Sequence, residues 1–171
     1  MKTNSETLAT GLIATGLTFL LSIGLIILHY LVFKRLMTKK NQDTSLNKSY
    51  LAIQLALVIS IGYCIYITYI PLTNALEIIR MNQIAGYSSI LQSIAGYAAI
   101  AFSFSIINSA LVLYLGTAFF KTNPKKIIEE DNWSVAIIVS LVIIAVIIID
   151  GYGLQAILQA FIPKLETPKI N

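Results

Sequence analysis

Charged residues are scarce in this sequence. Asp, Glu, Lys and Arg make up 12% of its 171 residues, whereas an ordinary soluble domain carries about 25%. Apolar residues account for 57% of the chain, and the mean hydropathy is +0.79. So few charges cannot cover the water-facing surface of a chain this long, which nearly excludes a soluble enzyme or DNA-binding domain. The net charge of +4 therefore does not indicate a nucleic-acid partner.

Cysteine and histidine are scarcer still. Cys64 and His29 are each the only one of their kind, so an internal disulfide, a CxxC motif and a cysteine-based metal cluster are excluded. A lone histidine does not make a metal site, which needs three or four ligands. The sequence also lacks a nucleophile–base pair and a phosphate-binding loop. It therefore predicts a protein that is not an enzyme and needs no cofactor or metal.

Long apolar runs are what the sequence does contain. A transmembrane helix needs about 20 consecutive apolar residues, and strands of a transmembrane barrel are shorter and alternate in polarity. Four runs reach the helical length, and Pro71 follows the second. The sequence predicts an all-α membrane protein with four transmembrane helices, over about residues 12–33, 50–70, 98–120 and 135–154.

Basic residues predict the orientation of these helices. The segments 34–49 and 121–132 carry five and three Lys or Arg residues, and the rest of the chain carries four. Because cytoplasmic loops are enriched in Lys and Arg, both segments are expected inside the cell and both termini outside. The first run is longer than a signal-peptide core and its basic flank lies on its far side, so we expect a retained span.

The chain also matches itself at an offset of 85 residues. This offset places Asn47 on Asn132, just before the second helix of each half, where a polar side chain caps free backbone N–H groups. The match predicts two like-oriented two-helix repeats, residues 1–78 and 79–171.

Two segments on the outer side complete this prediction. Residues 72–97 are expected to form a mixed linker at headgroup depth, because they are rich in Gly and Tyr. Residues 154–162 show apolar residues at helical spacing, which predicts a short helix lying in the membrane interface.

Polar residues within the spans are the candidate pathway or inter-helix residues. Asn108 lies in a row of small residues and is expected either to pack within the chain or to form a subunit interface. Asp150 lies about 25 Å along the helix from Trp133, so it either ends the helix in a hydrated turn or forms a proton or cation site. His29 and Gln54 lie at similar depth on adjacent helices, where they could hydrogen-bond; we expect them to serve packing between helices or to lie at the interface, in preference to chemistry.

The two inner loops are candidate surfaces for lipid or protein partners. The charged residues of the first loop are almost all basic, five of six, which favours contact with anionic lipid. In the second loop, Asn123-Pro124 predicts the start of a short helix, on which lysines and glutamates one turn apart pair. The loop residues concerned are Lys34, Arg35, Lys39, Lys40, Lys125, Lys126, Glu129 and Glu130.

Residues 119–149 combine a basic loop containing proline, an acidic run, and an asparagine before a new span. In this arrangement the chain resembles the bacterial YjfL-like inner-membrane family, domain of unknown function 350. The first half matches less well, because its acidic run is missing. The resemblance implies two tandem two-helix repeats, outside termini, location in the inner membrane and a role near envelope-stress or membrane-remodelling proteins. The matching positions are Pro124, Glu129, Glu130, Asn132 and Ala136.

These observations lead to one functional prediction and two alternatives. The first is a non-enzymatic inner-membrane subunit, a scaffold that associates with copies of itself and offers its inner loops to a cytoplasmic or membrane protein. The second is a small ion channel or transporter subunit with a polar pathway near Asn108 and Asp150. An intramembrane enzyme ranks third, because His29, Cys64 and Asp150 lie on different spans at different depths.

Overall fold

The computed structural model describes the backbone of residues 4–38, 47–81 and 87–163, and the side chains of residues 15–16, 18–38, 47–79 and 88–163. Within this part of the chain every element is an α-helix. Four of the helices are long and apolar enough to cross a membrane, which confirms the prediction of an all-α, multi-pass membrane protein. The helices are α1 (Asn4–Met37), α2 (Lys48–Met81), α3 (Tyr87–Phe119), α4 (Pro124–Glu129) and α5 (Trp133–Ala160).

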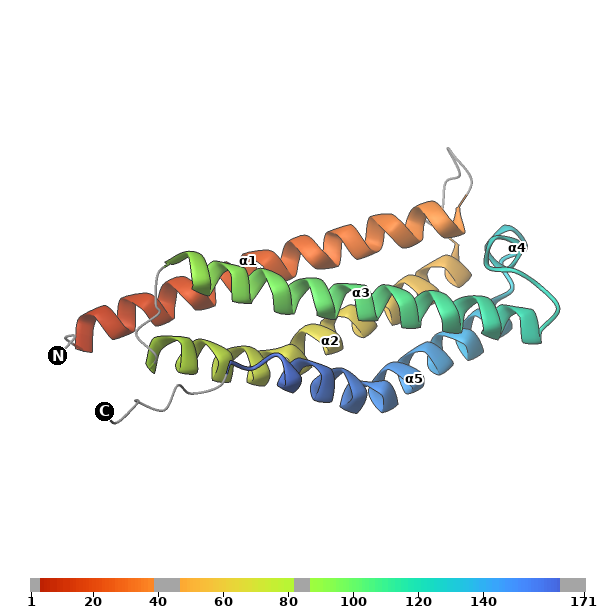
Figure 1. Ribbon diagram of the computed structural model, residues 1–171. Helices are drawn as coiled ribbons and strands as arrows, with labels where there is room; N and C mark the ends of the chain where they lie inside the picture. The colour runs from red at the N-terminus through yellow and green to blue at the C-terminus, as the bar shows by residue number, and fades with distance from the viewer. Residues whose placement is uncertain (1–3, 39–46, 82–86, 164–171) are drawn as a thin grey trace.

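The long helices form an up-and-down bundle (Figure 1). The start of α1 and the end of α5 lie at one end, called here the terminal end, and α4 lies across the other, called the α4 end. In cross-section α2 and α3 are neighbours, and α1 and α5 lie on opposite sides of this pair. Among the described residues, α1 contacts α2, α3 and α4 but not α5. The two hairpins are therefore packed unequally.

Pro71 does not end the second helix, contrary to the sequence-based prediction. It lies inside α2, which continues to Met81. Proline removes one backbone hydrogen bond and disfavours a helix interior. A helix that broke inside a membrane would leave several backbone groups without partners, which costs more. Pro71 and Leu72 are also buried against the rest of the bundle, and this packing favours the continuous helix.

The predicted outer segments are also the ends of long helices. Residues 72–81 belong to α2 and residues 87–97 to α3, so the predicted mixed linker over 72–97 is wrong for these residues. Asp150 does not end a helix, because α5 continues through it to Ala160. The turns after Asp150 are held by packing, since Leu154 and Leu158 are fully buried among residues of α2 and α3.

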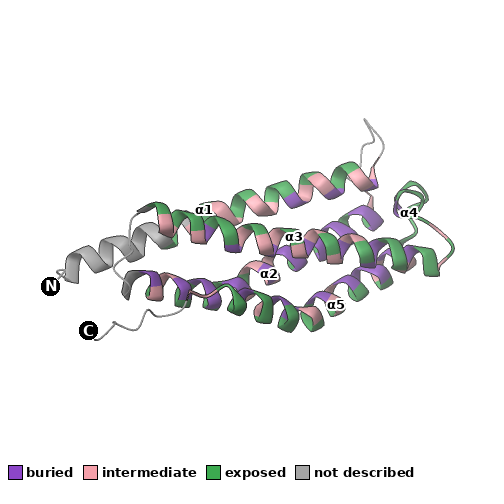
Figure 2. Ribbon diagram, in the orientation of Figure 1, coloured by how far each residue is buried: buried purple, intermediate pink, exposed green. Residues whose placement is uncertain are grey.

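Two apolar clusters hold the bundle together. The cluster at the α4 end includes Phe33, Leu57, Leu113 and Ile128, and therefore joins α1, α2, α3 and α4. The cluster toward the terminal end joins α2, α3 and α5. Figure 2 shows the buried residues along the faces between the helices, with little burial on α1.

The outward faces of the long helices are apolar as well. Leu20 on α1, Ile107 on α3 and Ile149 on α5 are each about two-thirds exposed. Large apolar surfaces of this kind are unfavourable in water and favourable in hydrocarbon. The surface therefore indicates contact with the lipid bilayer over the length of the bundle.

Candidate functional site

The short helix α4 forms where the sequence predicts it. Asn123 is its N-cap, and the Asn123 Oδ1 accepts a hydrogen bond from the backbone N–H of Lys126 at 2.9 Å. Pro124 occupies the first turn, where its missing N–H has no cost. The capping residue and the proline together confirm the predicted start of this helix.

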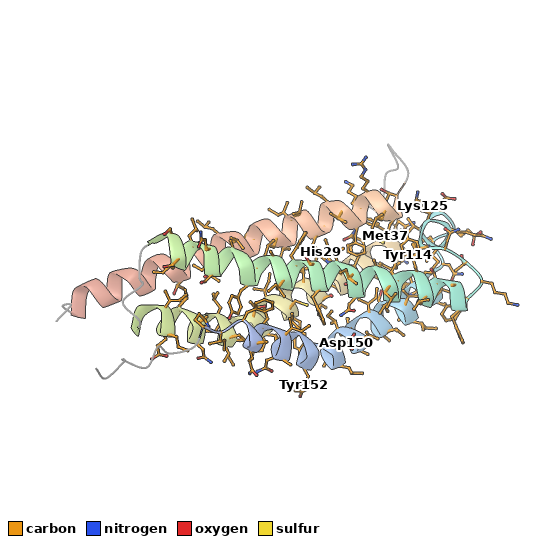
Figure 3. The ribbon with its side chains drawn as sticks, viewed as in Figure 1. His29, Met37, Tyr114, Lys125, Asp150 and Tyr152 are labelled. Carbon is orange, nitrogen blue, oxygen red and sulfur yellow. The ribbon has the colours of Figure 1, made fainter. Side chains whose placement is uncertain are left out.

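One face of α4 is anchored in the bundle and the other carries charges. Ile127 and Ile128 are fully buried in the cluster at the α4 end. The exposed face holds both lysines and both glutamates predicted as loop residues, and the Lys126 Nζ lies 3.7 Å from the Glu130 Oε1. This confirms the predicted pairing one turn apart for Lys126 and Glu130. Figure 3 shows Lys125 projecting from this end of the molecule.

The turn after α4 is tied to the start of α2. Asn47 caps α2 by accepting from the backbone N–H of Tyr50, and its amide donates to the carbonyl of Ile128. Asp131 has a positive φ of 45°, a conformation that ends helices such as α4. In that position its Oδ1 accepts from the backbone N–H of Ser49 at 2.9 Å. The second loop therefore caps α2, and its exposed charges are held in a fixed place.

The hydrogen bond from the Ser49 backbone N–H holds the pKa of the Asp131 carboxyl below its usual value of 3.8. The ionised carboxylate therefore stabilises the fold above pH 3.8, and this contribution is lost as the pH falls from there through the lower pKa of the folded state. We expect Asp131→Asn, which keeps the preference for positive φ, to lower the melting temperature more at about pH 7 than at about pH 2. Thermal unfolding of both proteins across this range measures the difference. An equal difference at both pH values would show that the carboxylate charge plays no part.

The first loop is only partly described. Lys34 and Arg35 lie in the last turn of α1, where positive charge interacts favourably with the helix C-terminus. The Lys34 Nζ also lies 5.9 Å from the centre of the Tyr30 ring. Lys39 and Lys40 lie outside the described residues, so the predicted basic surface is described only at its start.

A polar cluster lies in the interior of the bundle, between α1, α2 and α3. His29 Nε2 lies 3.2 Å from Ser105 Oγ, which lies 3.4 Å from Ser60 Oγ; Ser60 Oγ in turn lies 2.9 Å from Ser109 Oγ. All four side chains are buried. The His29 ring also lies 4.7 Å from the Phe33 ring, centre to centre. The cluster joins three helices by polar contacts, as small and polar residues do in membranes.

The structure places the other predicted polar residues apart from this cluster. Gln54 is buried, but His29 bonds Ser105 instead, so no hydrogen bond joins His29 to Gln54. This difference arises from helix rotation, which the sequence does not specify. Asn108 is half-buried and its Nδ2 has no hydrogen-bond partner. Asp150 is half-buried near the exposed Tyr152, and within the described residues no hydrogen bond joins it to Asn108.

The polar cluster contains side chains of the kinds that catalytic and metal-binding sites use. Ser105 and His29 form a hydroxyl–imidazole pair, the contact made by a nucleophile and its base. However, Ser105 is completely enclosed, and His29 Nδ1 has no acceptor to orient the ring. In the part of the chain that the structure describes, no three His, Cys, Asp or Glu side chains are placed to hold a metal ion. In the present conformation this cluster connects α1, α2 and α3.

Two structurally important residues were not predicted as such from the sequence. Asp131 is the last residue of the acidic run Glu129-Glu130-Asp131, and no local pattern in the sequence marks it as the partner of Ser49. Gly151 belongs to Gly-Tyr-Gly, and a Cβ added to it would lie 2.5 Å from Ile67 Cδ1 and 2.8 Å from Tyr63 Cε1. This glycine therefore allows α5 to approach α2 closely.

Comparison of the chain with protein-family models, with curated proteins and with solved structures finds no match.

Proposed function

We propose that this protein is a non-enzymatic subunit of a bacterial inner membrane, a scaffold whose α4 end binds a partner protein. The observation that carries the proposal is the construction of α4. Its isoleucines are buried in the bundle, its turn is hydrogen-bonded to α2, and its four charged side chains face outward. A charged surface held in one geometry suits recognition of a partner better than a loose loop does, because less ordering is needed on binding.

The proposed orientation and the proposed location in the inner membrane rest on the sequence. The excess of Lys and Arg in the segments at the α4 end favours a cytoplasmic location for α4, with both termini outside. The resemblance to the YjfL-like family favours the bacterial inner membrane and a role in the cell envelope. Within this proposal, partner binding takes place in the cytoplasm.

The proposal includes two like-oriented repeats. The first residues of α2 and α5, Lys48 and Trp133, are separated by the same offset of 85 residues that the sequence shows. Asn47 and Asn132 both cap the helix that follows them. These equivalent starts support a common origin of the two hairpins, which have since packed differently.

Association with further copies of the chain is also proposed. Of the four spans, α1 has the smallest buried share. Within the described residues α1 does not contact α5. The outward side of α1 is therefore available to pack against a second copy of the chain. Leu20, Ile27 and Leu31 are exposed on α1, and apolar side chains of this kind can pack against a helix of a second copy.

Charge reversal on α4 tests partner binding. A photo-crosslinking side chain placed at Glu129 in the full chain, in intact bacteria, is expected to capture a cytoplasmic or membrane protein. Reversing Lys125 and Lys126 to glutamate should reduce this capture at least about tenfold, because two exposed charges change sign. Lys121→Glu, an exposed change at the same end, is the control and should leave capture unchanged. Undiminished capture by the doubly reversed protein would remove the reason for assigning the partner to α4.

A small channel or transporter is the second candidate function. The observation in its favour is the buried polar cluster around Ser60 and Ser105, together with the unpartnered amide of Asn108. If this function is correct, vesicles containing the protein should conduct a defined ion, and Asn108→Leu should reduce the conductance. Vesicles that remain tight, or conductance unaltered by Asn108→Leu, would count against a pathway there.

A further inference from the structure

A groove lies between α1, α2 and α3 in the half of the bundle nearer the terminal end. Its volume is about 240 Å³. The α1 wall runs from Thr15 to Leu25, the α2 wall from Ile65 to Leu72, and the α3 wall from Ile94 to Ala101. The groove is partly open to the side, between helices whose outward faces are apolar. It is separate from α4 and its charges.

Two of the polar side chains in the walls, Ser22 and Thr68, bond to their own helices. Ser22 Oγ donates to the carbonyl of Thr18 at 2.7 Å, and Thr68 Oγ1 donates to the carbonyl of Cys64 at 2.7 Å. With their hydroxyl protons used in this way, these side chains present mainly carbon atoms to the groove. The remaining walls are mostly Leu, Ile, Ala and Phe. An occupant is therefore apolar along its length, because a polar group would find few partners.

The position of the groove matches one leaflet of a bilayer. Lys34 ends the apolar part of α1 at the α4 end. Gly24 precedes it by ten residues, so the two positions are separated by about 15 Å along the helix. Gly24 therefore lies at the midplane of a hydrocarbon core about 30 Å thick. The groove extends from Leu25, at that depth, to Thr15, close to the opposite surface. Its length along α1 is therefore about 15 Å, the depth of one leaflet's hydrocarbon.

The deep end of the groove is lined by apolar side chains. Leu25 and Ala101 line it there, and each lies one helical turn before a member of the polar cluster, His29 or Ser105. A ligand with a polar group at its deep end would meet carbon atoms instead of these hydrogen-bonding groups. A chain that ends in a methyl group fits, whereas a ligand with a buried polar head does not.

We propose that this groove binds one acyl chain of a phospholipid from the leaflet at the terminal end. The chain enters from the side, lies between α1 and the α2–α3 pair, and ends at the midplane against Leu25 and Ala101. The bound chain fills the space between α1 and the α2–α3 pair. Of the four spans, α1 has the smallest buried share. The bound lipid is therefore a structural ligand that holds α1 in place.

Filling the groove with a larger side chain tests this proposal. Ala98 lines the groove on α3, whereas Ala95, one turn away on the same helix, is exposed and does not. The full chain is reconstituted with phosphatidylglycerol, transferred to detergent, and examined by native mass spectrometry. The unaltered protein and Ala95→Phe are expected to retain one phosphatidylglycerol per chain. Ala98→Phe should reduce this retention at least about fivefold.

Added phosphatidylglycerol gives a second measurement, because a ligand that binds only the folded state raises the melting temperature. We expect it to raise the melting temperature of the unaltered protein and of Ala95→Phe, but not of Ala98→Phe. If Ala98→Phe does not fold, as judged by circular dichroism, the smaller Ala98→Leu replaces it. Equal lipid retention by the Ala98 and Ala95 variants would overturn the proposal. So would a lipid-free dimer that the Ala98 variant converts to monomers, since a second copy would then fill the groove.

Discussion

Replacing Gly151 with valine is expected to lower the free energy of unfolding by about 3 kcal/mol, at the upper end of the usual cost of overpacking a core. Even a single added carbon would lie 2.5 Å from Ile67 Cδ1 and 2.8 Å from the Tyr63 ring. The isoleucine end can turn aside, but the ring has less room, so α5 must move away from α2. Reversible unfolding in lipid–detergent mixtures measures the loss.

Gly153 provides the matched control on the same helix. It is exposed, and a Cβ added there meets nothing within 4 Å. Gly153→Val should therefore change the unfolding free energy by less than about 0.5 kcal/mol, as surface substitutions usually do. Equal losses for the two valine variants would show that helix propensity, and not the approach of α5 to α2, determines the effect.

Replacing His29 with alanine is expected to cost about 2–4 kcal/mol, because it leaves a cavity beside Phe33 and Ser105. His29→Leu nearly conserves the volume of the side chain and loses the hydrogen bond to Ser105. Hydrogen bonds between membrane helices contribute about 0.6 kcal/mol on average, and Ser105 retains Ser60 as a partner. We therefore expect the leucine variant to lie within about 1 kcal/mol of the unaltered protein.

The neighbouring Leu28 is the control for the alanine variant, since it is 46% exposed on the outward side of α1. Leu28→Ala should have little effect, because its side chain contacts lipid in both forms. A large loss for His29→Leu would mean that the polar contact with Ser105, and not packing, determines the stability of the cluster. Unfolding free energies of the three variants decide this.

Helix number and the end caps at the α4 end were predictable because they depend on local chemistry. The apolar runs are long enough to require helices in a membrane, and Asn47, Asn123 and Asn132 stand where free backbone N–H groups begin. The opposite ends were predicted less well. Pro71 and the glycines beside Asp150 normally interrupt helices, but burial of Leu72, Leu154 and Leu158 outweighs this preference.

The polar contacts within the bundle were harder to predict. His29 and Gln54 lie at similar depth in the sequence, but depth alone does not specify which way a helix faces. The rotation of α1 places His29 against Ser105 of α3, which is 76 positions away in the chain. The contact between Ser49 and Asp131 joins residues 82 positions apart, and no local pattern relates them.

The sequence alone determined that this protein spans a membrane as four helices, that α4 forms, and that segments 34–49 and 121–132 carry most of the basic charge. Each of these depends on apolar length, capping chemistry or charge counts along a short stretch of chain. Only the tertiary structure decided that α4 is anchored to α2, that serines and a histidine join three helices, and that a groove lies beside α1. These features depend on the rotation and separation of packed helices, which result from all their contacts together.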